Sequence, residues 1–149
     1  MKQFKVCKAS LFVFGLSISA WSHCQIEAQN NSIIVVANIN ESGLTLTKQQ
    51  VKSLFMGSSL GYNFNVATLP PSSLVRVTFN TQVIGLTEDR IQSFWAQMRF
   101  TGRKTQPKQI DSLESLLDYV KNTPGAVTYL PSSVVVPENL TVLYKTGAL

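Results

Sequence analysis

The run from Ile33 to Ala37 is apolar at every position, with the sequence Ile-Ile-Val-Val-Ala. Successive side chains of a strand point to opposite faces of its sheet, so a strand with one exposed face alternates apolar and polar residues. A strand without a polar position belongs inside a sheet that is covered on both faces. The run therefore predicts a central strand, and the other segments must supply the layers that cover it.

Helices with recognisable start and stop signals follow this run. Thr47 and Gln50 form a capping box for a helix that is expected to stop at Gly57. Thr87 is expected to cap a second helix with Phe94 and Trp95 on its buried side.

A third helix and several extended segments complete the chain. Asp111 is expected to cap an amphipathic helix that ends at Asn122. Further strands or extended pieces are predicted at 66–69, 126–130, 134–137 and 140–144. Strands that alternate with helices predict an α/β fold, with a small mixed sheet flanked by helices in one domain of residues 29–149.

Residues 1–28 are predicted to be a signal peptide. Three lysines within the first eight residues precede a short apolar run at 11–21, which is the pattern of a secretory signal. Cleavage after Ala28 is favoured, with Ala20 and Cys24 as the alternatives. The predicted location of the remaining chain is the periplasm.

Loss of that segment would remove both cysteines and the histidine, so of the usual catalytic sites only those built on carboxylates would remain possible. Cys7, Cys24 and the single histidine, His23, all precede the favoured cut. Without them the chain has no disulfide, no Ser-His-Asp triad, no Cys-His pair and no ordinary zinc site. Ten basic and seven acidic residues would remain, and this net charge of +3 is too small and diffuse to indicate nucleic-acid binding. We expect no enzymatic activity and no cofactor.

The acidic side chains that remain are expected to have no catalytic role. Asp111, Glu114 and Asp118 lie at helical spacing on a surface helix, and Glu88 and Asp89 suit the positive end of a helix dipole. The basic connection from Arg99 to Lys108 is interpreted as a solvated loop in preference to a binding site.

The stretch from Pro70 to Arg76 is the candidate ligand site. Two prolines end an extended segment, Ser72 and Ser73 can cap a helix, and Arg76 follows one turn later. Free amides at a helix start and a guanidinium favour an oxyanion. A plain helix cap with a solvated arginine is the alternative. Val75 to Phe79 fits a strand by alternation and a helix by the spacing of its apolar residues.

Several segments, taken in order, resemble the bacterial periplasmic phosphate-binding proteins of ABC importers. The matching segments are Ile33 to Asn38, Leu46 to Val51, Leu54 to Gly57, Phe94-Trp95, Phe100 to Gly102, Pro107, and Pro124 to Pro131. Together they span nearly the whole of 29–149. The resemblance implies a type II periplasmic-binding-protein fold and favours a helix after Ser73. Its members usually have two lobes that close on the ligand, and these residues are enough for about one lobe.

The resemblance also gives the candidate site a ligand. Ser72 to Arg76 falls where the family has a Gly-Ser-Gly-Thr-Arg phosphate loop, with Ser73 matching the serine and Arg76 the arginine. Ser72 and Leu74 replace glycines and Val75 replaces the threonine, which removes a hydroxyl donor. The implied partners are inorganic phosphate or a similar oxyanion, together with a membrane permease, a membrane sensor, or a second lobe gained by dimerisation. The alternative is a ligand-free interaction or sensor module.

Overall fold

The computed structural model describes residues 31–41 and 43–147, so the predicted signal peptide and its cleavage sites lie outside the described residues. The strands are β1 (Ile33–Ala37), β2 (Asn65–Thr68), β3 (Lys108–Gln109), β4 (Ala126–Pro131) and β5 (Thr141–Lys145). The helices are α1 (Lys48–Phe55), α2 (Leu74–Phe79), the π-helix η1 (Asn80–Ile84), α3 (Glu88–Phe100) and α4 (Leu113–Asn122). Within this part of the chain, no helix is both long and apolar enough to cross a bilayer.

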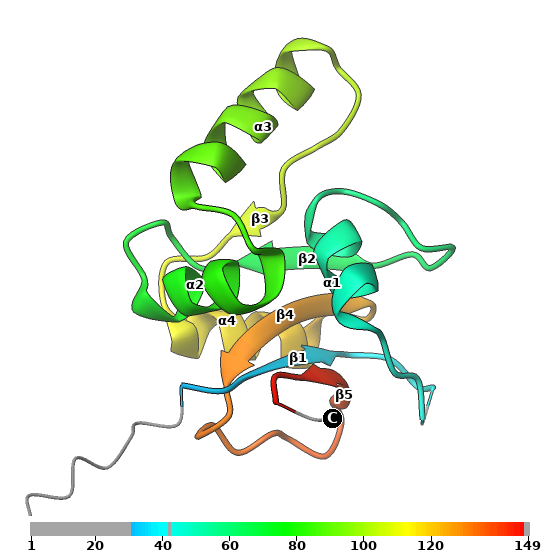
Figure 1. The fold of residues 1–149 in the computed structure, drawn as a ribbon. Coiled ribbons are helices and arrows are strands. Elements are labelled where there is room, and N and C mark those ends of the chain that lie inside the picture. The colour runs from blue at the N-terminus through cyan, green and yellow to red at the C-terminus, as the bar shows by residue number, and fades with distance from the viewer. Residues whose placement is uncertain (1–30, 42, 148–149) are drawn as a thin grey trace, which may run out of the picture.

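The five strands form one mixed sheet in the order β3-β2-β4-β1-β5. β2 runs parallel to both β3 and β4, whereas β1 is antiparallel to β4 and β5. Helix α4 covers one face, and α1 and α2 cover the other, while α3 and its following loop project from the body beyond β2 and β3 (Figure 1). The predicted α/β class with a small mixed sheet between helices is confirmed.

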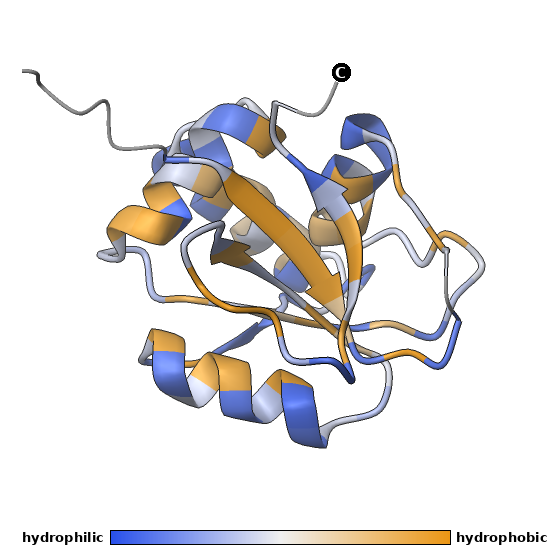
Figure 2. Cartoon of the chain, turned by 90° about the horizontal axis from the view of Figure 1, so that it is seen from below, coloured by the Kyte–Doolittle hydropathy of each residue, from blue (hydrophilic) through white to orange (hydrophobic). Residues whose placement is uncertain are grey.

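β1 is buried at all five positions, as its sequence predicts. Ile33, Val35 and Ala37 belong to the larger core, together with buried residues of α1, α2, η1 and α3. Ile34 and Val36 belong to a second core with Val120 of α4. Figure 2 shows the hydrophobic middle of the sheet, and helices with both hydrophobic and hydrophilic residues. Both faces of β1 are therefore covered, which explains why the strand has no polar position.

The helix starts follow the predicted signals in part. Thr47 and Gln50 form the predicted capping box of α1, and the left-handed Gly57 follows its end. Thr87 is the N-cap of α3 but makes no side-chain capping hydrogen bond. The assignment of Asp111 as a cap is wrong, because Ser112 is the N-cap of α4 and accepts the amide of Ser115. The predicted end of α4 at Asn122 is correct.

The segment after Ser73 is a helix, and the strand alternative is wrong. α2 continues directly into η1, and Gly85 ends this helical segment in the left-handed conformation with φ 70°. Phe79 is buried because its ring stacks on Tyr129, with centroids 4.1 Å apart, and contacts Phe55 at 4.7 Å. This aromatic contact fixes the face of α2 that packs on the sheet.

One predicted extended segment differs from the structure, because residues 134–137 form no strand. The segment predicted at 140–144 is the last strand, β5, shifted by one residue. The two-residue β3 within the basic connection was not predicted, since both of its side chains are exposed and no apolar alternation marks it.

Candidate functional site

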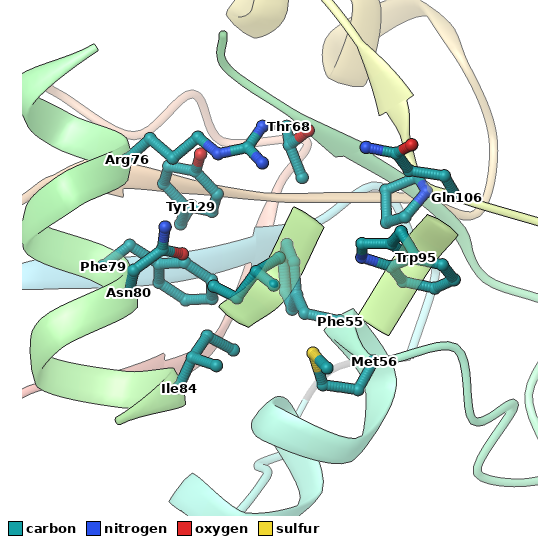
Figure 3. Close-up of a pocket in the computed structure, with 12 residues that line it drawn as sticks. Phe55, Met56, Thr68, Arg76, Phe79, Asn80, Ile84, Trp95, Gln106 and Tyr129 are labelled. Atoms are coloured by element: carbon teal, nitrogen blue, oxygen red, sulfur yellow. Dashed lines mark hydrogen bonds between the residues drawn. The ribbon is translucent and has the colours of Figure 1, made fainter. Parts of the chain in front are cut away.

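Arg76 lies in the first turn of α2, and its side chain points back toward the carboxyl end of β2. Only 5% of the residue is exposed. Its Nη1 donates to the carbonyl oxygen of Leu69 at 2.6 Å and to Thr68 Oγ1 at 3.4 Å (Figure 3). A buried guanidinium needs an anionic partner as well as neutral acceptors, because desolvation of an unpaired charge is costly.

That partner is Glu88, the first residue of α3. Arg76 holds the carboxylate bidentately, with Nε 2.9 Å from Oε2 and Nη2 2.6 Å from Oε1. Asn80 Nδ2 donates to Oε2 at 2.7 Å, and Gln92 Nε2 donates to Oε1 at 2.6 Å. Each carboxylate oxygen thus accepts two hydrogen bonds. Glu88 lies in the first turn of α3, where a negative charge suits the helix dipole as expected, but its carboxylate also pairs with Arg76, which was not predicted.

The hydrogen bonds and the guanidinium around Glu88 favour its ionised form. Partial burial by itself would raise the pKa of Glu88, but the hydrogen bonds from Arg76 and Gln92 and the charge of Arg76 outweigh it and hold the pKa below the ordinary 4.5. A carboxylate is an oxyanion, and a fork of this geometry is the arrangement with which arginine binds carboxylate and phosphate. The donors of Arg76, Asn80 and Gln92 therefore form an oxyanion-binding cluster that an internal carboxylate occupies.

The lowered pKa predicts how stability depends on pH. Because the folded-state pKa of Glu88 is depressed, the group stabilises the fold above pH 4.5, and this contribution is lost as the pH falls through the folded-state pKa. We expect Glu88→Gln to be less stable than the unmodified protein near neutral pH, with a gap that narrows below the ordinary pKa. Urea unfolding of both proteins from near neutrality to about pH 3 measures the gap. A gap that stays constant over this range would contradict the assignment.

The cavity beside Arg76 is small. It has a volume of about 20 Å³ and is lined by Thr68, Asn80, Trp95, Tyr129 and others drawn in Figure 3. That volume accommodates about one water molecule. It lies beside Thr68, the last residue of β2, and Tyr129 of β4. Burial raises the pKa of Tyr129 to about 12, so its hydroxyl, which accepts the Leu69 amide at 3.2 Å, stays uncharged.

The other predicted site residues do not line this cavity. Ser72 is exposed, and Ser73 is the N-cap of α2 but makes no capping hydrogen bond. Leu74 is 81% exposed, and with the half-buried Val75 it lines a separate depression near Ile33 and Pro131. The amides of the first helical turn have no acceptor within the helix, as at every helix start. The structure brings Arg76 together with residues that the sequence reasoning did not select.

The sequence did not lead us to select three residues of this cluster, namely Asn80, Glu88 and Gln92. Asn80 lies four residues after Arg76, and Gln92 four residues after Glu88, so each pair shares a helix face. Asn80 is only 6% exposed, and both Phe79 before it and Val83 three residues after it are buried core residues. A polar residue inside an apolar helical stripe is the signal that points to a buried partner. Among residues 31–41 and 43–147, no group of three or more His, Cys, Asp and Glu residues is placed to hold a metal ion.

Comparison with known proteins supports the fold. No protein-family model and no curated protein matches the chain. Among solved structures, the chain is similar to an ABC-type phosphate transport receptor from Vibrio cholerae, with a TM-score of 0.53 and 20% sequence identity. The likeness covers 80% of this chain and 51% of that receptor, so the chain matches about half of the receptor's length. The protein therefore shares its α/β fold with about half of that receptor.

Proposed function

We propose that this protein is an exported, non-enzymatic solute-binding protein whose oxyanion site is centred on Arg76, and that Glu88 occupies the site when no oxyanion is bound. The observation that carries the proposal is the bidentate grip of Arg76 on a carboxylate, reinforced by Asn80 and Gln92. Inorganic phosphate presents oxygens of the same hydrogen-bonding character.

The position of the cluster supports the same class of ligand. Arg76 is the residue that matches the arginine of the phosphate loop in the resemblance described above, and the similar solved structure is described as a phosphate transport receptor. An incoming anion must displace Glu88, whose side chain is 21% exposed and therefore accessible from one side. Because Glu88 competes for the same donors, binding in the unmodified protein is expected to be weak, in the millimolar range of about 4 kcal/mol.

The proposed place of action is the periplasm. Residues 1–28 direct export to the periplasm, and residues 29–149 form the binding domain. A membrane permease, a membrane sensor, or a second lobe in a dimer is the partner. Such a partner would complete an oxyanion site that one lobe encloses from only one side. Nucleic acid is not among the proposed ligands.

Calorimetric phosphate titration of the unmodified protein, Glu88→Ala and Glu114→Ala tests the ligand. Glu88→Ala removes the internal competitor and leaves the guanidinium free, so we expect phosphate affinity to rise by at least about tenfold, which corresponds to 1.4 kcal/mol. Glu114 also lies in the first turn of its helix but is exposed, so Glu114→Ala controls for the loss of one negative charge.

Arg76→Gln in the Glu88→Ala background should abolish the gain in phosphate affinity. If phosphate and sulfate bind none of these proteins at tens of millimolar, the oxyanion proposal fails. A melting curve of each variant verifies that it is folded.

The second candidate function is a ligand-free interaction or sensor module. Two observations favour it: both oxygens of Glu88 are fully engaged, and the neighbouring cavity is about 20 Å³. On this alternative the Arg76–Glu88 pair is a structural replacement for the ligand. The module then acts by presenting a face to a membrane partner. The same titration separates the two, because the alternative requires that the unmodified protein bind no phosphate.

A further inference from the structure

The end of α3 carries an exposed aromatic side chain between two arginines. Phe100, the last residue of α3, is 94% exposed, and Arg99 and Arg103 on either side are exposed as well. We call Arg99, Phe100 and Arg103 the basic tip. Figure 1 places the end of α3 and the following loop away from the sheet, and no other helix or strand of the described residues covers them there.

Backbone hydrogen bonds within the loop stabilise the conformation of the basic tip. The amide of Gly102 donates to the Arg99 carbonyl at 3.1 Å, and the amide of Arg103 donates to the Met98 carbonyl at 3.2 Å. With Gly102 left-handed at φ 64°, these two bonds form a Schellman motif. Lys104 then anchors the loop, since its Nζ donates to the Met56 carbonyl at 3.3 Å. The tip is therefore a preorganised surface, not an irregular loop.

The basic tip lies in a segment whose charged residues are all positive. Five of the basic residues lie between positions 90 and 108, and no acidic residue lies between 90 and 110. Within the described residues 31–41 and 43–147, neither Arg99 nor Arg103 forms an ion pair. Arg99, Gly102, Arg103 and Lys104 also line an open depression of about 600 Å³. Arg99 and Arg103 thus carry positive charges on either side of Phe100, the one large exposed apolar side chain between positions 90 and 108.

We propose that the basic tip docks the protein on the surface of an anionic phospholipid bilayer. Guanidinium groups fit the phosphodiester of lipid headgroups, and an aromatic side chain inserts at the boundary between headgroups and acyl chains. A stable protein interface uses about 20–30 residues on each side, many more than the three residues of the basic tip. At the tip Phe100 is the one large exposed apolar residue, and its neighbours are cationic, which favours the lipid surface.

Vesicle sedimentation tests the docking with protein recovered from the periplasm after expression of the full chain. The vesicles are either neutral phosphatidylcholine or contain about one third phosphatidylglycerol, at low ionic strength. We expect binding to the anionic vesicles only. Phe100→Ser should weaken it about tenfold, and the double variant Arg99→Gln/Arg103→Gln about 25-fold, at about fivefold for each cation near a charged surface.

Two controls separate the tip from general effects. Lys48→Gln/Lys145→Gln removes two exposed cations elsewhere, and Val135→Ser removes an 88% exposed apolar side chain elsewhere. Both should bind as the unmodified protein does. Addition of about 10 mM inorganic phosphate should leave most of the binding intact, because free phosphate lacks the apolar phase that Phe100 enters.

Three results would overturn the proposal. Absence of vesicle binding would exclude the bilayer and leave an acidic protein surface as the partner class. Equal losses in the tip and control variants would reduce the effect to net charge. Complete displacement by free phosphate would assign the tip to the soluble anion. All variants change exposed side chains, so their melting temperatures should match that of the unmodified protein.

Discussion

Trp95→Ala is expected to lower the free energy of unfolding by about 3–5 kcal/mol, the usual cost of deleting a buried aromatic side chain. Trp95 is 2% exposed, and its ring makes an edge contact with Phe94 at 5.0 Å. Ile91 and Trp95 are the buried residues of α3, so this helix is attached to the body through few apolar contacts. Loss of the indole should loosen α3 and with it the position of Glu88. Urea denaturation measures the change.

Phe100→Ala on the same helix is the matched control for that experiment. Because Phe100 is 94% exposed, its replacement should change stability by less than about 0.5 kcal/mol. A Trp95→Ala protein as stable as Phe100→Ala would contradict the packing of α3 against the body. Phe94, which the sequence predicts to be buried, is only half-buried, so its replacement should cost less than that of Trp95.

The Arg76–Glu88 pair is expected to give the second largest effect. Glu88→Met leaves the guanidinium, with a 6% exposed side chain, without an anion, and should destabilise the protein by about 2–4 kcal/mol. This lies toward the lower part of the range for breaking a buried pair, because the Glu88 side chain is 21% exposed and partly solvated. Arg76→Met should cost a similar amount, since Glu88 then keeps only Asn80 and Gln92 as donors.

The double variant Arg76→Met/Glu88→Met completes a thermodynamic cycle. An apolar pair of similar volume avoids the unpaired charge, so the double variant should lose much less than the sum of the single losses. Additive losses would show that the two side chains are not coupled. Thermal or urea unfolding of the four proteins at neutral pH provides the comparison.

Local signals in the sequence were sufficient for most of the fold. The unbroken apolar run of β1 and the Thr47–Gln50 capping box each act within a few residues, and each appears where it was predicted. The π-helix and the two-residue β3 depend on how distant segments pack, and they leave no local pattern. The choice between helix and strand after Ser73 was ambiguous for the same reason, since the contact of Phe79 with Tyr129 fixes it.

The candidate site was predicted in part. Arg76 was selected because of its place in a helix start, and that helix exists. Its partner was missed because the contact with Glu88 spans 12 residues and depends on the turn at Gly85 between two helices. Propensities describe single segments, whereas this ion pair is a tertiary contact. The roles of all five predicted site residues in ligand binding remain predictions, namely Ser72, Ser73, Leu74, Val75 and Arg76.

Chemical shifts of the Arg76 Nε–H group and of the Ser73 to Arg76 amides during a phosphate titration test the central claim most directly. The account predicts saturable shifts at these groups, a simultaneous change at the Gln92 side-chain amide as Glu88 leaves, and loss of all three in Arg76→Gln. Binding near millimolar corresponds to about 4 kcal/mol, which such a titration can follow. An Arg76 signal that stays unchanged at tens of millimolar phosphate, in both the unmodified protein and Glu88→Ala, would contradict the account.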